Sequence, residues 1–134
     1  MVRLPDWSML LSNHLAERAG MPFEWGVNDC MIFVCSTVAK LTGEDHFPKF
    51  NDYHDEETGR ALLEKSGGVE GIITACLGTG SREILKAKRG DVVTVKMPEL
   101  TGGIVDDSGQ RIALVTPKGL IRVPLSKAWR YWSY

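Results

Sequence analysis

The chain has 134 residues, of which 43% are hydrophobic and 25% are charged, and this composition is typical of one folded globular domain rather than of a disordered chain. Lys and Arg number 16 against 17 Asp and Glu, so the formal net charge is −1 and the pI is near 6.3. This balance argues against a nucleic-acid-binding protein that works through a basic face.

Targeting and redox signals are weak along the whole chain. No apolar run reaches the roughly 18 residues that a membrane span needs, and the start of the chain lacks the apolar core of a signal peptide. The three cysteines, Cys30, Cys35 and Cys76, are an odd number without a C-x-x-C pair, which favours neither a disulfide framework nor a zinc site. We therefore expect no membrane span, no metal, no cofactor and synthesis in a reducing compartment.

Four helices are predicted in the first part of the chain. The first covers residues 5–19, where apolar residues recur three and four positions apart. The second begins at about Cys30, directly after the N-cap candidates Asn28 and Asp29, and ends before Gly43. It is apolar nearly all round, which is typical of a central, buried helix. Two further helices are expected at 55–65 and 69–77.

The hydrophobic pattern changes its period near Arg89, and strands are predicted beyond that point. They cover residues 91–96, 103–105, 111–115 and 120–123, and residues 128–134 form a candidate fifth strand. Helices first and a strand meander afterwards predict an α+β fold with one antiparallel sheet, in a single domain that spans residues 1–134. We expect the helix at 30–41 to pack across that sheet.

Cys30 is the position with the most reactive chemistry. A thiol in the first turn of a helix lies at the positive end of the helix dipole, where free amide N–H groups point at it. Both features favour the thiolate, which is the nucleophile, and the same N–H groups are candidates for an oxyanion hole. The alternative is that Cys30 is simply a small apolar residue at the start of a buried helix.

The residues around Cys30 match a known pattern. Residues 22–30 read PFEWGVNDC and resemble the nucleophile segment of NlpC-type cysteine peptidases, a papain-like family that cuts bacterial cell-wall peptides. The later segments RGDVV (89–93) and TGGIV (101–105) resemble the strand and the hairpin that follow the helices in that family, in the same order. The chain looks most like small NlpC-like proteins encoded among phage tail genes, and this resemblance implies a papain-like α+β fold.

The match to the family is incomplete at the catalytic positions. Active members carry a catalytic His directly before the apolar-Gly-Ile step, and the matching residue here is Thr101. The residue that orients the base in the family falls at Ala113. The resemblance therefore implies that Cys30 keeps the nucleophile position while the base and its orienter are lost. Because the residues of a catalytic triad act as a unit, we expect no hydrolysis.

The polar stretch 44–54 and the start of the next helix carry candidate metal ligands, namely His46, Asp52, His54, Asp55 and Glu56. Their spacing matches no standard zinc or calcium loop, so no metal site is expected. His46 and His54 are also candidates for a relocated base, because a long loop can fold over a site. His14 is expected at the edge of the first helix, and the two loop histidines otherwise lie at the surface.

The C-terminus is dense in aromatic residues and cations: Lys127, Trp129, Arg130, Tyr131, Trp132 and Tyr134. Aromatic residues and Arg are enriched at protein interfaces. A strand with aromatic residues at both parities cannot have both faces in water, so we expect one face in the core and one against a partner protein. The residues assigned to the partner contact are Trp129, Arg130, Trp132 and Tyr134.

Two functional hypotheses of different classes follow, and the first is favoured because of Thr101 and Ala113. In the first, the chain is a phage tail-tip structural protein with a degenerate NlpC-like fold, which contacts a tail hub or adjoining tip subunits. It would lie in the virion tail, and in the host cytoplasm during assembly. In the second, it is an active peptidoglycan endopeptidase or amidase that uses Cys30 to aid host entry. A third alternative is a bacterial housekeeping domain unrelated to phage.

Overall fold

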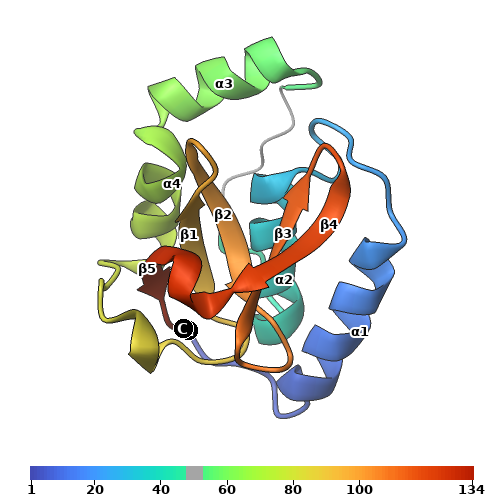
Figure 1. The fold of residues 1–134 in the computed structure, drawn as a ribbon, viewed down its shortest axis with the longest axis vertical. Coiled ribbons are helices and arrows are strands. Elements are labelled where there is room, and N and C mark those ends of the chain that lie inside the picture. Colours follow the sequence, from blue (N-terminus) through green and yellow to red (C-terminus); the bar gives the residue numbers. More distant parts are fainter. Residues whose placement is uncertain (48–52) are drawn as a thin grey trace.

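The computed structural model describes residues 1–47 and 53–134, and the described chain has four α-helices followed by a five-stranded antiparallel sheet (Figure 1). The helices are α1 (Trp7–Ala19), α2 (Cys30–Thr42), α3 (Glu56–Lys65) and α4 (Gly68–Leu77). The strands are β1 (Val92–Lys96), β2 (Leu100–Val105), β3 (Arg111–Thr116), β4 (Gly119–Pro124) and β5 (Ala128–Trp132). The predicted α+β class is confirmed.

The helix boundaries have local causes that the sequence carries. The carboxylate of Asp29 caps α2 by accepting the N–H of Ile32 at 2.9 Å, and the helix ends at Gly43 with a φ of 77°. Asp55 and Thr58 form a reciprocal capping box at the start of α3. These caps fix the two ends of α2 and the first turn of α3, and thereby the position of Cys30.

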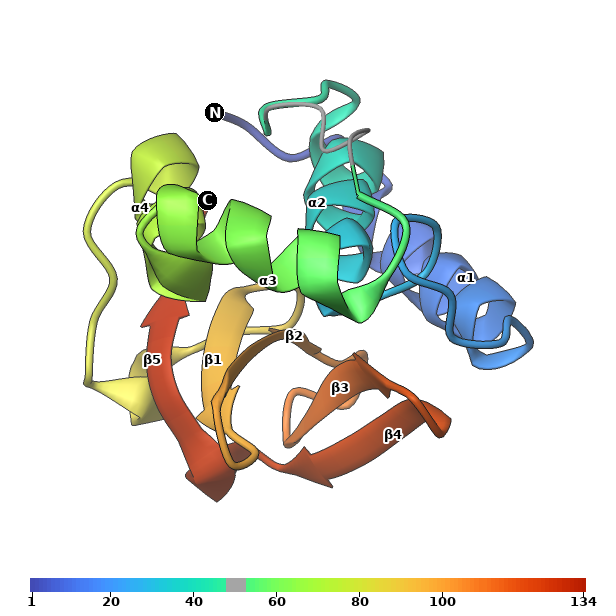
Figure 2. The same ribbon diagram turned by 90° about the horizontal axis from the view of Figure 1, so that it is seen from above.

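The sheet has the strand order β4-β3-β2-β1-β5 and is strongly curved, with α2, α3 and α4 on one side and α1 beside α2 (Figure 2). β1 and β2 pair along their length, from Val92↔Ile104 to Lys96↔Leu100. β2 and β3 pair only at Ile104↔Ala113 and Val105↔Ile112. The two strands therefore separate toward their other ends, where the groove described below opens.

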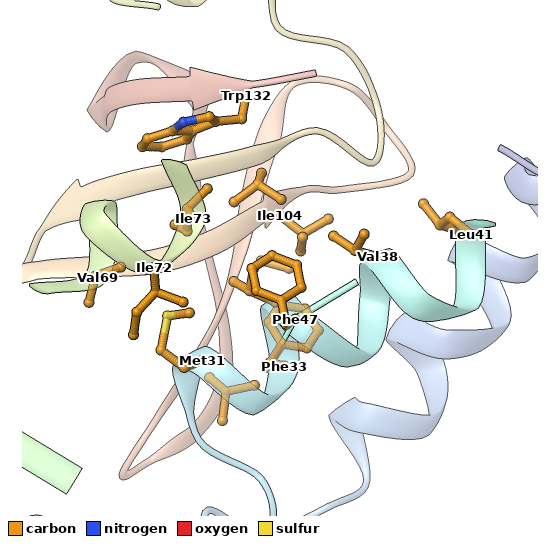
Figure 3. Packing of buried hydrophobic residues seen from close by; sticks show 14 of the residues in the cluster. Met31, Phe33, Val38, Leu41, Phe47, Val69, Ile72, Ile73, Ile104 and Trp132 are labelled. Atoms are coloured by element: carbon orange, nitrogen blue, oxygen red, sulfur yellow. The ribbon is translucent and has the colours of Figure 1, made fainter. Parts of the chain in front are cut away.

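Apolar side chains pack on both faces of the sheet. The larger cluster lies between the sheet and the helices, and Figure 3 shows Phe33 and Val38 of α2 packed near Ile104 of β2 and Ile73 of α4. The smaller cluster fills the concave face and consists of Val93, Val95, Val105, Ile112, Leu114 and Ala128. The predicted packing of α2 across the sheet is confirmed, because its inward side chains are fully buried.

Three details differ from the sequence-based expectation or lie beyond it. β2 begins at Leu100 rather than at residue 103, because the hairpin with β1 continues pairing to its tip. Short 3-10 turns at Ile84–Lys86 and Leu125–Lys127 were not predicted. Asp52 lies outside the described residues. None of the described helices is long and apolar enough to cross a bilayer.

Candidate functional site

Cys30 lines an open groove with a volume of about 1070 Å³. The groove runs between α3, the loop before α2 and the tips of the β1–β2 and β3–β4 hairpins, and its apolar walls include Trp25, Leu63, Met97, Val115 and Ile121. On its inner side Cys30 borders a small cavity of about 30 Å³, which Leu62 and Leu63 of α3 and Ile72 of α4 close. α3 and α4 therefore cover this inner side of the thiol.

Asp29, next to the thiol, is the structural centre of the helix start. Its side chain is 2% exposed and accepts three hydrogen bonds: from the N–H of Ile32 at 2.9 Å, from the N–H of Gly26 at 2.8 Å and from the hydroxyl of Tyr53 at 2.5 Å. Burial and the bond to Asp29 raise the pKa of Tyr53. Asp29 is therefore occupied in holding the loop, the helix and Tyr53 together.

The Trp-Gly pair before Asp29 also has a structural role. Gly26 adopts a φ of 80°, and a side chain there would overlap the carbonyl oxygen of Tyr53. Trp25 packs edge-on against Phe23, with ring centroids 5.0 Å apart, and its ring lies against Gly59 of α3. The residues that carry the resemblance around Cys30 thus explain the shape of this segment without any catalysis.

The place of Cys30 at a helix start predicts a thiolate, but the surroundings of Cys30 favour the protonated thiol. Burial raises its pKa to about 11, and the neighbouring Asp29 carboxylate acts in the same direction. The backbone N–H groups of Gly102, Met31 and Cys30 itself lower the pKa, but by less than burial raises it. The expected preference for the thiolate is therefore wrong: the helix terminus is present, and desolvation outweighs it.

Gly102, rather than Thr101, lies on the face of β2 that meets Cys30. A side chain at Gly102 would contact Val34 and Met31 of α2 at 3.1 and 3.6 Å. Thr101 is paired with Val95, which belongs to the cluster on the opposite, concave face, because successive strand residues alternate between faces. Thr101 lines the groove, yet its hydroxyl donates to the carbonyl of Glu99 at 3.3 Å. Neither position supplies a base.

Ala113, matched to the orienting residue of the family, does not lie in the groove. It is fully buried opposite Ile104 in the cluster beneath α2. The residues of β3 that line the groove are Val115 and Thr116. The structure therefore brings Cys30 and Thr101 to one groove and leaves Ala113 outside it.

The histidines differ in their position relative to Cys30 and the groove. His54 lines the groove, but its side chain is 81% exposed and its Nε2 lies 3.8 Å from Asp55. His46 does not line the groove and faces Glu44 at 3.8 Å. Within residues 1–47 and 53–134, no side-chain hydrogen bond joins Cys30 to a histidine. The expectation for the loop histidines thus holds for His54, while His46 is partly buried.

His14 is buried, which corrects the expectation that it sits at a helix edge. It is 3% exposed, stacks on Phe33 with a centroid distance of 6.1 Å and lies 3.3 Å from the hydroxyl of Ser36. Burial, together with the Arg18 charge, lowers its pKa to about 4. His14 is therefore a neutral packing residue between α1 and α2 at neutral pH.

The Gly-Asp segment that resembles the family's strand has its own structural explanation. Asp91 is 1% exposed and accepts hydrogen bonds from Arg3 at 2.7 Å and from Ser133 at 2.8 Å. Burial raises the pKa of Asp91, and its hydrogen bonds and the Arg3 charge counteract that shift. Asp91 thus joins the two ends of the chain to the start of β1.

The C-terminal residues divide differently from the prediction. Trp132 is 2% exposed and packs in the core near Ile73 (Figure 3), so its assignment to a partner contact is corrected. The hydroxyl of Tyr134 donates to the carbonyl of Gly90 at 2.7 Å, and Arg130 pairs with Glu70 at 3.0 Å. Only Trp129 of this set carries a large side chain that is neither core nor tied by such a bond.

Metal-ligand chemistry is sparse in the described part of the chain. No group of three or more His, Cys, Asp and Glu side chains comes together there as metal ligands would.

Tyr53 and Gly102 are the site residues that the sequence did not predict. Tyr53 lies far from Asp29 along the chain. Gly102 is next to Thr101, the residue that the family motif matches, but it lies on the other face of β2.

The chain belongs to DUF6950, a domain family of unknown function, whose model matches residues 2–134. No curated protein matches the chain. The family match extends over every helix and strand of the described fold.

Proposed function

We propose that this protein is a non-catalytic structural component of a phage tail tip, built on a degenerate NlpC-like fold. The observation that carries the proposal is the state of Cys30, a partly buried thiol in the wall of the groove with its pKa raised to about 11. In the described residues its strand neighbours are Gly102 and Thr101, and neither can accept a proton at neutral pH.

The size of the effect supports a loss of catalysis. With a pKa near 11, roughly one thiol in ten thousand is ionised at pH 7, and the thiolate is the nucleophile. A positioned general base adds about 10²–10⁴-fold in rate, and that contribution is missing as well. A protein that keeps the nucleophile position, but has neither a lowered thiol pKa nor a general base, is better suited to binding than to hydrolysis.

The tail-tip setting rests on the resemblance to small NlpC-like phage proteins. The structural roles of Asp29 and Gly26 support the scaffold interpretation, because they explain why the fold keeps this segment when catalysis is absent. A tail-tip component is expected in purified virions, which protein mass spectrometry of particles from a phage that encodes the chain can test. Its absence from such particles would contradict the proposal.

The catalytic part of the proposal is tested on purified bacterial cell walls near pH 7. We expect no release of peptide fragments from the wild-type protein or from Cys30→Ala, while an active wall hydrolase used as a control releases them. Release by the wild type that is lost in Cys30→Ala would overturn the proposal.

The second candidate function is an active cell-wall cysteine peptidase, which one observation favours. His54 lines the same groove as Cys30, so a movement of its exposed side chain is the available route to a base. In that case hydrolysis would be lost in both Cys30→Ala and His54→Ala and retained in His46→Ala, since His46 lies outside the groove.

A further inference from the structure

Trp129 is held between two cations at the surface. The guanidinium carbon of Arg82 lies 3.3 Å from the centroid of the indole ring, and the Nζ of Lys96 lies 3.5 Å from it. Two cations this close to one centroid cannot share a face without overlapping, so they lie on opposite faces of the ring. Their charges are therefore at most about 7 Å apart.

The backbone fixes the three residues of this cation–indole site in place. Trp129 is the extra residue of a bulge in β5, between Ala128, paired with Val95, and Arg130, paired with Thr94. Arg82 follows Ser81, which exchanges two backbone hydrogen bonds with Tyr131, and Lys96 ends β1. Each member of the site is thus carried by a paired strand or bridge rather than by a free loop.

The positive charge of the site is not neutralised within the part of the chain that the structure describes. In residues 1–47 and 53–134 neither Arg82 nor Lys96 pairs with a carboxylate, and the adjacent Glu83 is paired with Lys86 at 2.9 Å. Lys127, two residues before Trp129, adds a third exposed cation nearby in sequence. Like charges held so close repel each other, so an anion placed beside them lowers the electrostatic energy.

We propose that Arg82, Trp129 and Lys96 form a binding site for an acidic segment of a partner protein, with one carboxylate against each cation and the indole edge between them. The proposal rests on the structural role proposed above and deepens it by naming the chemistry of the partner. It also retains Trp129 from the residues assigned to a partner contact, while Trp132, Tyr134 and Arg130 are engaged within the chain.

The spacing and the surroundings specify the ligand. Side chains two residues apart on an extended strand lie on one face roughly 7 Å apart, which matches the largest separation that the two cations allow. Large exposed apolar residues belong to the same segments: Leu85, 93% exposed, follows Arg82 closely, and Met97, 40% exposed, follows Lys96. Apolar side chains beside a few cations suit a protein surface better than a nucleic acid, and the net charge of −1 also disfavours a polyanion.

The test uses the full chain and a defined probe, the peptide acetyl-Gly-Glu-Gly-Glu-Gly-amide, with the Gln-for-Glu peptide as its control. Binding is followed by nuclear magnetic resonance through the indole N–H signal of Trp129, assigned with Trp129→Phe. We expect a saturable shift with the Glu peptide at low salt, no shift with the Gln peptide, and loss of the effect at high salt. Arg82→Gln and Lys96→Gln should each weaken binding about fivefold, whereas Lys40→Gln should not, because it lies in the last turn of α2, near the start of β1, while Lys96 ends that strand.

Several outcomes would overturn the site. They are no shift at about 5 mM Glu peptide, equal responses to the two peptides, or equal loss in Lys40→Gln. A shift produced by an oligothymidine or by phosphatidylglycerol vesicles but not by the Glu peptide would replace the acidic protein with a phosphate-bearing ligand. The cell-wall assay is independent of this site, so a failure of peptide binding removes the acidic partner and leaves the test of the non-catalytic role unaffected.

Discussion

Replacing Asp29 with Ala should destabilise the protein strongly, because one buried carboxylate serves three donors. Loss of the α2 N-cap costs about 1 kcal/mol, and loss of the bonds from Gly26 and Tyr53 costs about 1–1.5 kcal/mol each. The expected decrease in the free energy of unfolding is about 3–4 kcal/mol. For a chain of this length that corresponds to a melting temperature about 10–15 °C lower.

Urea unfolding followed by circular dichroism measures this change, with Asp29→Asn as the matched variant. Asn caps a helix as well as Asp does, but it offers one oxygen instead of two, so we expect it to cost about 1–2 kcal/mol. Tyr53→Phe should be less costly in the Asp29→Ala background than in the wild type, because its hydrogen-bond partner is already gone. A loss below about 1 kcal/mol in Asp29→Ala would show that the three hydrogen bonds to Asp29 do not stabilise the fold.

Three further predictions concern stability. In urea titrations, Trp132→Ala should lower the free energy of unfolding by about 3–5 kcal/mol and Trp129→Ala by under about 1 kcal/mol, because Trp132 is in the core and Trp129 is not. Equal losses in the two variants would contradict this difference in burial. The pKa of His14 is about 4 in the folded state and 6.5 in the unfolded state, so between these pH values only the unfolded chain is protonated there. The free energy of unfolding should therefore fall as the pH is lowered from 6.5 to 4, by up to about 3 kcal/mol. His14→Leu should flatten that dependence, and an unchanged slope would count against it. Arg3→Ala should lower the free energy of unfolding by about 3–5 kcal/mol in thermal unfolding, because it leaves Asp91 buried without its cation. The second change Asp91→Asn should restore part of the stability if the unpaired carboxylate is the cause. No loss in Arg3→Ala would exclude this cause.

The elements of the fold were predictable where the cause is local. The N-cap at Asp29 and the left-handed Gly43 are visible in the sequence, and they mark the two ends of α2. Short, nearly continuous apolar runs likewise marked β1 and β3, each of which has four consecutive buried residues.

The site was less predictable because its geometry depends on register and on distant contacts. The family motif matches the base to Thr101, whereas the neighbouring Gly102 is the residue of β2 that faces α2, and adjacent strand residues lie on opposite faces. The bulge at Trp129 changes parity in the same way, so Ala128 shares a face with Tyr131 instead of with Arg130. The raised pKa of Cys30 comes from burial beneath α3 and α4, which no spacing in the sequence expresses.

The non-catalytic role depends on the protonation state of Cys30, which the rate of Cys30 alkylation as a function of pH measures. In a variant with Cys35→Ser and Cys76→Ser, Cys30 is the only thiol, and the same chain unfolded in urea is the reference. We expect the rate of carboxymethylation in the folded protein to rise about tenfold per pH unit up to pH 10 without levelling. At pH 8 it should be about a hundredfold slower than in the unfolded chain. A rate that levels below pH 8 in the folded protein would show an activated thiolate and overturn the non-catalytic role.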